Sequence, residues 1–194
     1  SAIATIHTQR GDYDKALDVF TKAEVIAERV GDQRLIGMIS GNIGVVHMER
    51  GEPDKALEYY QKNLRISERI GDLKVIAMMY NNIGNVLKGR AEYDRSLSMH
   101  EKGLRIKERL GDQLGIASSY MNIGNIHKER GEYGKALDCY GRCASICEKL
   151  GELRGAGLAY GNQAVVHYEK GEFDRAIEGH DRASRIREKL GDKS

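Results

Sequence analysis

The stretch Tyr80-Asn81-Asn82-Ile83-Gly84-Asn85-Val86-Leu87 returns along the chain in near-copies at intervals of forty residues. The other copies begin at Ser40, Tyr120 and Tyr160. A Gly-Asp or Gly-Glu pair keeps the same interval at 31, 71, 111, 151 and 191, and a second glycine marker does so at 11, 51, 131 and 171, with Ala91 in the remaining copy. No insertion breaks the register, which indicates one structural unit stacked on itself.

The repeat markers recur without a break through residues 1–194, so the whole chain is expected to form a single array. Because the chain opens in what should be the middle of a helix, we expect it to be a fragment of a longer protein, of a signalling or adaptor kind. The predicted divisions are a partial repeat at 1–30, complete repeats at 31–70, 71–110, 111–150 and 151–190, and the start of a further repeat or a tail at 191–194.

Composition narrows the classes of function. The 31 basic residues nearly balance the 29 acidic ones, and a net charge of +2 gives no overall field to hold nucleic acid or an anionic membrane. No run approaches the roughly 18 apolar residues that span a bilayer. Three cysteines, all within 139–147, cannot form a disulfide framework. We therefore expect a cytoplasmic protein that needs no cofactor and binds neither nucleic acid nor membrane.

Within each repeat the apolar residues recur at helical spacing, and the turn residues divide the repeat into two helices. Gly31 is expected to end one helix in a left-handed cap, and Asp32 to cap the next. Glu52 is the following N-cap, and Pro53 takes the first helical position, where its missing N–H costs nothing. The same pattern predicts helices at 13–30, 33–50, 53–70, 73–90, 93–110, 113–130, 133–150, 153–170 and 173–190, with residues 1–10 as the end of another.

Connections of two residues force successive helices to run antiparallel, so each repeat is a helical hairpin that buries its apolar face against the next. The predicted fold is therefore all-α, a solenoid of tandem antiparallel hairpins. Ala91 is the one exception among the glycine caps, and a left-handed cap at alanine costs about 1 kcal/mol relative to glycine. This turn is therefore expected to be either reshaped or locally weaker. Because Leu87, Ser96 and Gly103 also depart from the other copies, the repeat at 73–110 is expected to be the least regular.

Spacing inside the repeat distinguishes between families of helical hairpin. On the first helix, Tyr80 and Leu87 are the large residues of the motif, and Ile83-Gly84 stands for its Leu-Gly pair; on the second helix the motif continues as Ala56-x3-Tyr60. The small residues are expected to let the two helices of a hairpin approach closely, with the aromatic residues filling the gap beside them. In this pattern the chain resembles a tetratricopeptide array over its full length, which implies a right-handed superhelix. HEAT repeats have a similar length but lack this placement of glycine and alanine.

A narrower resemblance rests on the residues that follow the motif glycine. Ile83-Gly84-Asn85 and Ile123-Gly124-Asn125 are similar to the Leu-Gly-Asn of forty-residue tetratricopeptide repeats in the LGN/Pins type of spindle-orientation scaffold. The copies at Ile43-Gly44-Val45 and Gln163-Ala164-Val165 depart from it.

The tetratricopeptide resemblance implies a peptide-binding groove lined by the first helices. An asparagine offers a donor and an acceptor at once, as the backbone of an extended peptide requires. The alternative is that these asparagines bond to the neighbouring hairpin and hold the stack together. The implied asparagine column is Asn42, Asn82, Asn122 and Asn162, and the neighbouring groove residues include Asn81, Asn85, Asn125, Met78, Met121, Lys88 and Lys128.

Other polar columns have structural explanations. The basic residues at 10, 50, 90, 130 and 170 stand in the last turn of first helices, where the helix dipole favours a cation. The histidines, including His47, His100 and His180, occupy positions of packing aromatics. Cys139, Cys143 and Cys147 form a stripe on one helix, and ligands in a line cannot surround a metal ion. No catalytic set or phosphate loop appears outside the repeat columns, so we predict neither enzymatic activity nor a metal site.

The sequence therefore predicts a scaffold that binds a protein or peptide ligand, extended or helical, in the groove. The competing hypothesis is a structural spacer that assembles end to end, although a monomer is expected. A receptor for a small molecule is a third class, with no residues in its favour. The apolar residues expected on the end faces are Ile3, Ile6, Ile177 and Ile186.

Overall fold

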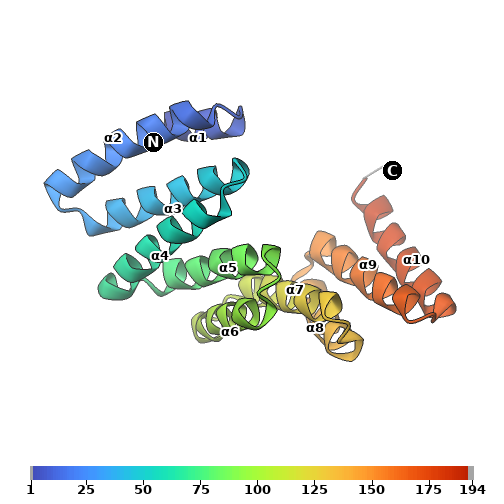
Figure 1. Cartoon of the computed structure of the whole chain (residues 1–194). Helices are drawn as coiled ribbons and strands as arrows, with labels where there is room; N and C mark the ends of the chain where they lie inside the picture. The colour runs from blue at the N-terminus through green and yellow to red at the C-terminus, as the bar shows by residue number, and fades with distance from the viewer. Residues whose placement is uncertain (1, 192–194) are drawn as a thin grey trace. The chain divides into compact units, whose positions relative to one another are not determined.

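Every element of the structure is an α-helix over residues 2–191, the range that the computed structural model describes. The helices form two compact units, of which the first ends at Ala91 and the second begins at Glu92. In Figure 1, successive helices within each unit run antiparallel and are joined by tight turns. The all-α fold of tandem hairpins is thus confirmed, whereas the further repeat expected at 191–194 lies, apart from Gly191, outside the described residues.

The first unit stacks its helices in chain order. α1 packs on α2, α2 on α3, α3 on α4 and α4 on α5. Its core includes Ala16, Phe20, Ile39 and Ile43. The helices are α1 (Ala2–Gln9), α2 (Tyr13–Val30), α3 (Gln33–Glu49), α4 (Pro53–Ile70) and α5 (Leu73–Gly89).

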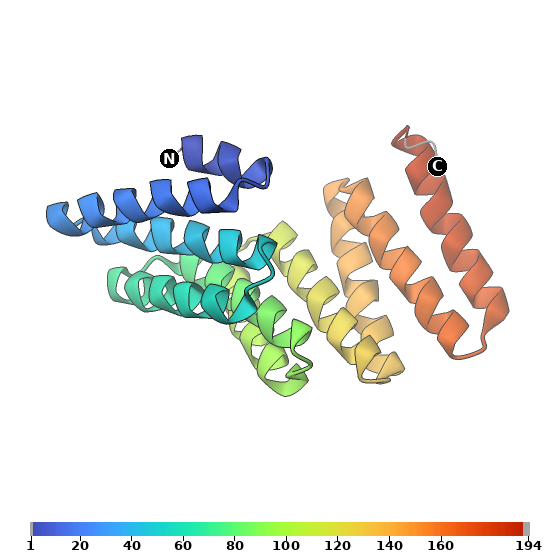
Figure 2. The same ribbon diagram turned by 45° about the horizontal axis from the view of Figure 1, so that its top comes forward.

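The second unit repeats the arrangement, and Figure 2 shows α7, α8, α9 and α10 following one another in a row. One core cluster joins Cys143 and Cys147 to Ala156, Ala159 and Tyr160. The helices are α6 (Tyr93–Leu110), α7 (Gln113–Glu129), α8 (Tyr133–Leu150), α9 (Leu153–Glu169) and α10 (Phe173–Lys189).

Helix ends agree with the predicted ends to within one residue. The first helices stop at 49, 89, 129 and 169, one residue earlier than expected. The reason is the closing turn, in which Gly51 adopts a φ of 78° and its N–H donates to the carbonyl of Met48 at 3.0 Å. The N–H of Glu52 then donates to the carbonyl of His47 at 2.8 Å, which satisfies the carbonyl groups at the helix end.

The first and second helices of a hairpin begin in different ways. Asp32 caps α3 as predicted, because its Oδ1 accepts from the N–H of Leu35 at 2.9 Å. Pro53 takes the first position of α4, as expected. Glu52 precedes it but makes no side-chain cap bond, so its predicted capping role is wrong. Its carboxylate instead lies 2.7 Å from Nδ1 of His47, in the last turn of the preceding helix.

Small residues let the two helices of a hairpin approach closely. A Cβ built onto Gly44 would lie 2.6 Å from the ring of Tyr60, and one on Gly124 would lie 2.7 Å from the ring of Tyr140. Both tyrosines are buried. The predicted roles of small and aromatic residues are therefore confirmed in these hairpins, and the contact is close-packed.

Candidate peptide-binding surface

The first unit exposes an apolar surface with asparagines at its centre. On α3, Met38 and Val45 are 55% and 40% exposed, and Asn42 lies half-buried between them at helical spacing. On α5, Met78 is 50% exposed, and Asn82 follows it on the same face. We call Met38, Asn42, Val45, Met78, Asn82 and Asn85 the asparagine face.

The amides of Asn42 and Asn82 make no side-chain hydrogen bond within residues 2–191. Comparison of equivalent positions in the repeats explains why Asn82 lacks such a bond. Its counterpart Asn162 bonds to Asn125, but the residue equivalent to Asn125 in the first unit is Val45, which has no acceptor in its side chain. Asn82 is therefore available to a ligand.

The second unit uses its asparagines differently. Nδ2 of Asn162 donates to Oδ1 of Asn125 at 3.3 Å and contacts Sδ of Met121 at 3.1 Å. The hydroxyl of Tyr140 donates to the same Oδ1 at 2.8 Å. These bonds join both α9 and α8 to α7. At Asn162 the geometry thus agrees with the alternative that the asparagine column holds the stack.

The remaining residues of the expected groove lie on the first helices at differing depths. Asn85 is exposed. The others, which are half-buried, are Asn81, Lys88, Asn122 and Lys128.

A histidine–carboxylate pair closes the turn inside four of the hairpins, and the sequence interpretation missed it. His47 meets Glu52 at 2.7 Å, His127 meets Glu132 at 2.8 Å, and His7 meets Asp12 at 3.2 Å. The signal was present as a histidine five residues before an acidic residue, repeated at the same place in the unit. Because these histidines stand at positions of packing aromatics, that position alone does not point to the acidic residue five positions later.

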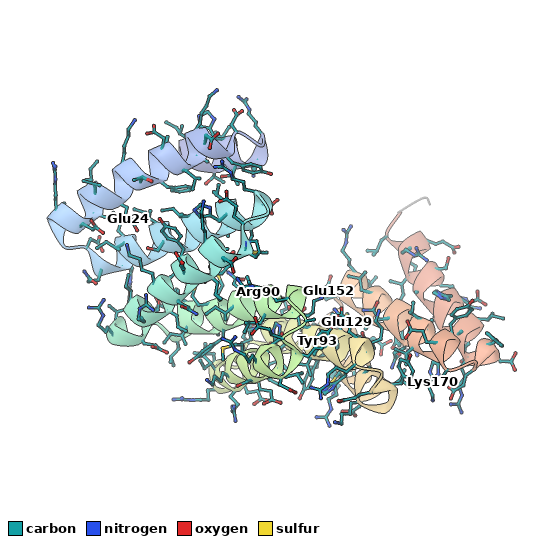
Figure 3. All side chains as sticks on the ribbon, in the orientation of Figure 1. Glu24, Arg90, Tyr93, Glu129, Glu152 and Lys170 are labelled. Carbon is teal, nitrogen blue, oxygen red and sulfur yellow. The ribbon has the colours of Figure 1, made fainter. Side chains whose placement is uncertain are left out.

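The fourth pair joins Nδ1 of His167 to Glu172 at 2.6 Å. Glu172 also meets the ammonium group of Lys170 at 2.5 Å, and Lys170 is labelled in Figure 3. The hydrogen bonds from Lys170 and then His167 lower the pKa of Glu172 to about 2. At neutral pH the carboxylate is therefore charged, and it joins the last turn of α9 to the residue that precedes α10.

The basic column has a second role besides the helix dipole. Arg50 forms an ion pair with Asp14 at 2.7 Å, and Arg90 and Arg130 pair in the same way with an aspartate thirty-six residues earlier. Each pair connects one hairpin to the hairpin before it. Gly134 replaces the aspartate that would serve Lys170, so Lys170 turns to Glu172 instead. The pairs are solvent-exposed, so water and salt screen them and each contributes little to stability.

A different polar bridge joins α2 to the next hairpin. Oε1 of Glu24, labelled in Figure 3, accepts from Ser40 of α3 and from Lys62 of α4, each at 3.0 Å. The equivalent positions of later repeats are Leu64, Leu104, Ala144 and Ser184. This bridge is therefore peculiar to one repeat and does not define a repeated binding site.

Buried reactive groups lie in the packing between helices. Cys139, Cys143 and Cys147 are buried, as expected, and burial raises the pKa of Cys143 to about 12. Lys107 is also buried, where its Nζ donates to Oγ of Ser119 at 2.8 Å and burial lowers its pKa. Among residues 2–191 no group of three or more His, Cys, Asp or Glu side chains could hold a metal ion.

Two expected packing positions are wrong. His180 was expected to pack like an aromatic residue but is exposed, and Ile186 was expected on an exposed end face but is half-buried. Both lie on α10, where Ile186 turns towards Gly157 of α9.

Solved structures share this fold. The chain superposes with a TM-score of 0.89 on BtubC (BKLC) from P. vanneervenii, at 24% identity, over 98% of this chain and 79% of that one. Aspartyl phosphate phosphatase F from Bacillus subtilis gives a TM-score of 0.90 at 18% identity, over 97% of this chain but 50% of that one. A Rap protein complexed with competence and sporulation factor gives 0.80 at 19% identity, over 97% and 53%.

Sequence comparison gives the family. No curated protein sequence matches the chain. Within residues 2–191 no helix is both long and apolar enough to cross a bilayer. The family model for the tetratricopeptide repeat matches residues 1–69, 35–109 and 75–149 in overlapping segments. With these matches and the stacked hairpins, the chain belongs to the tetratricopeptide repeat family.

Proposed function

We propose that the chain is a protein-interaction scaffold that binds a peptide segment on the asparagine face of its first unit. The observation that carries this proposal is the amide of Asn82, which has no partner within residues 2–191 and lies beside the exposed Met78. An amide can donate to and accept from a peptide backbone, and exposed methionine adapts to irregular side chains.

Two further features support the proposal. The asparagine face repeats from α3 to α5 with the same spacing, so Asn42 and Asn82 offer a row of amides along an extended ligand. The fold is also shared with a Rap protein whose structure contains competence and sporulation factor. The Ile-Gly-Asn copies at 83 and 123 favour a repeat of the LGN/Pins type, with forty-residue units and a scaffold role.

The proposal is tested by capture from a displayed peptide library. The double change Asn42→Ala with Asn82→Ala should lower the affinity for captured peptides by about tenfold, because the variant loses two hydrogen bonds to the peptide backbone. A matched control changes the exposed amides Gln9 and Gln113 to alanine, outside the asparagine face. If the asparagine variant captures the same peptides as the wild type with equal affinity, the asparagine face is not the binding surface.

A structural spacer that assembles end to end is a second candidate, because Ile3 and Ile177 are each 61% exposed. Light scattering over a concentration series separates the two functions. Growth in mass with concentration supports assembly, and a constant monomer mass eliminates it.

A further inference from the structure

The second unit carries an apolar pocket at the edge where one hairpin is joined to the next, and its volume is about 480 Å³. In Figure 2 this edge holds the turn from α8 to α9 and the end of α10. Four leucines line the pocket, from the starts of α7 and α9 and the ends of α8 and α10: Leu114, Leu153, Leu150 and Leu190. We call these four residues the leucine edge.

The leucine edge is exposed to solvent. The exposed fractions are 55% for Leu114, 36% for Leu153, 47% for Leu150 and 41% for Leu190. At the position of Leu114 the other repeats have cations, which are Arg34, Lys74 and Arg154. A cation at such a position is readily solvated, whereas an exposed leucine is not. The packing of the repeat therefore does not account for the leucine at 114.

A further repeat of the chain would leave this edge uncovered. Leu110, one repeat before Leu150, is 39% exposed although α8, α9 and α10 follow it in the stack. Leu150 itself is exposed although the α9–α10 hairpin follows it. The reason is that the hairpins pack along their sides, so that the turns between them stay at the edge. The leucine edge is therefore not a contact between successive repeats.

Two cations flank the leucines. Lys149 directly precedes Leu150, and Lys189 directly precedes Leu190. Both lysines are exposed, and neither forms an ion pair within residues 2–191. Their charges are therefore available to a partner.

The nearby carboxylates are engaged within the fold or lie on another side of their helix. Glu152 accepts from a backbone N–H in the first turn of α9 at 2.5 Å and so caps that helix. Glu148 forms an ion pair with Arg182 at 2.8 Å. Glu188 stands two residues before Leu190, which places it about 200° around the helix axis from that leucine. The charge beside the leucine edge is therefore mainly positive.

Leucines beside available cations favour an acidic peptide as the occupant. Apolar side chains that enter the pocket are removed from water, which favours binding. A hollow between leucines receives protruding side chains, as a peptide offers and a bilayer surface does not. A second copy of this chain would bring its own lysines to the contact if the same edges met, and like charges oppose that arrangement.

We propose that the leucine edge, together with Lys149 and Lys189, docks an acidic segment of a partner protein that carries apolar side chains between its carboxylates. The apolar side chains enter the pocket, and the carboxylates pair with the two lysines. The site lies within the second unit and is separate from the asparagine face of the first, so either site can fail its test without the other.

The probe is a displayed library of short peptides that combine leucine, isoleucine, phenylalanine and methionine with aspartate and glutamate. A second library has lysine and arginine in place of the acidic residues. The full 194-residue chain should enrich peptides from the acidic library and none from the basic one. Enriched peptides are then synthesised with a fluorescent label, and anisotropy measures their affinity. Failure of the acidic library to yield a peptide, or equal enrichment from the basic library, would contradict the proposal.

Leu114→Gln should lower the affinity for the enriched peptides by about tenfold, because apolar surface that the peptide covers is lost. The matched control is Leu158→Gln on α9, since Leu158 is 61% exposed and lies outside the leucine edge. It should bind the peptides as the wild type does. Peptides held at the leucine edge should also keep their affinity for the Asn42→Ala, Asn82→Ala variant. Equal affinity of the wild type and Leu114→Gln would overturn the proposal.

Lys149→Gln with Lys189→Gln should lower the affinity by about tenfold at low ionic strength and by less at high salt, because salt screens exposed charges. The matched control changes Lys22 and Lys135 to glutamine, which removes the same charge at exposed positions away from the leucine edge. It should bind as the wild type does. An equal loss of affinity in both variants would show that the net charge alone attracts the peptides, and the proposal would fail.

Two further measurements reveal other occupants. Co-sedimentation with vesicles of phosphatidylcholine and phosphatidylserine that is lost in Leu114→Gln would assign the leucine edge to a membrane surface. Growth in mass with concentration, followed by light scattering and lost in Leu114→Gln, would assign it to a second copy of the chain. Either result would overturn the assignment to an acidic peptide.

Discussion

Single residues decide how a repeated position is used. Asn82 and Asn162 occupy equivalent places in their repeats, yet Asn162 bonds to Asn125 while Asn82 has Val45 at the corresponding place. Ala91 departs from its repeat in a different way. It is the non-glycine residue with positive φ in the described structure, at 58°, where every other copy has glycine. The turn at Ala91 therefore keeps the left-handed conformation of the glycine copies and is not reshaped.

Ala91→Gly should raise the free energy of unfolding by about 1 kcal/mol, because glycine adopts a left-handed conformation without the steric cost of a Cβ. Urea denaturation followed by circular dichroism measures the change. Gly51→Ala is the matched control and should lower the free energy of unfolding by a similar amount, since Gly51 has a φ of 78°. A lower urea midpoint for Ala91→Gly would show that the cap is not strained.

At the scale of elements, the turns between helices are held by paired side chains as well as by backbone. The imidazole–carboxylate pairs join the last turn of a first helix to the residue before the second helix. The carboxylate pKa is lowered in Glu52, mainly by His47, and in Glu132, mainly by Lys135. Charge at the turn therefore contributes to the stability of the hairpin.

The pH dependence follows from Glu172, whose pKa falls from 4.5 to about 2 in the folded chain. A lowered carboxylate pKa stabilises the fold above pH 4.5, and this contribution is lost as the pH falls from 4.5 towards 2. His167→Gln should therefore raise the Glu172 pKa and flatten the acid dependence of stability. Carbon-13 NMR titration of the Glu172 carboxyl group measures the pKa, and an unchanged value in the variant would rule out the contribution of His167.

At the scale of the whole molecule, stability is a sum of contacts between neighbouring helices. Within the second unit α9 contacts α8, α10 and, to a lesser extent, α7. Such a stack has no single central core, so a substitution that destabilises one hairpin should lower the stability mainly of the hairpins next to it.

Gly44→Ala tests this expectation, because its Cβ would lie 2.6 Å from the Tyr60 ring. The overpacking should cost about 1–3 kcal/mol. Amide hydrogen exchange should accelerate in α3 and α4 and in the adjoining helices, while α9 and α10 keep their wild-type protection. Gly134→Ala serves as the control, since a Cβ there meets no atom within 4 Å. Equal acceleration along the whole chain would contradict coupling between neighbours alone.

The sequence by itself determined the helices, their ends and the pairing of small with aromatic residues. These follow from local rules: apolar spacing, glycine at a left-handed cap, and proline at the first helical position of α4. The candidate face was also predictable, as the column of asparagines that includes Asn42 and Asn82. A pattern that repeats with fixed spacing carries this information without reference to distant residues.

Tertiary structure decided which member of each column has a partner. Whether an asparagine makes a hydrogen bond within the stack depends on the residue that the neighbouring repeat presents to it. That residue is Asn125 for Asn162 and Val45 for Asn82. The same holds for Glu52, which meets His47 instead of capping α4. Hydrogen bonds require distances near 3 Å and correct angles, and only the packed structure fixes them.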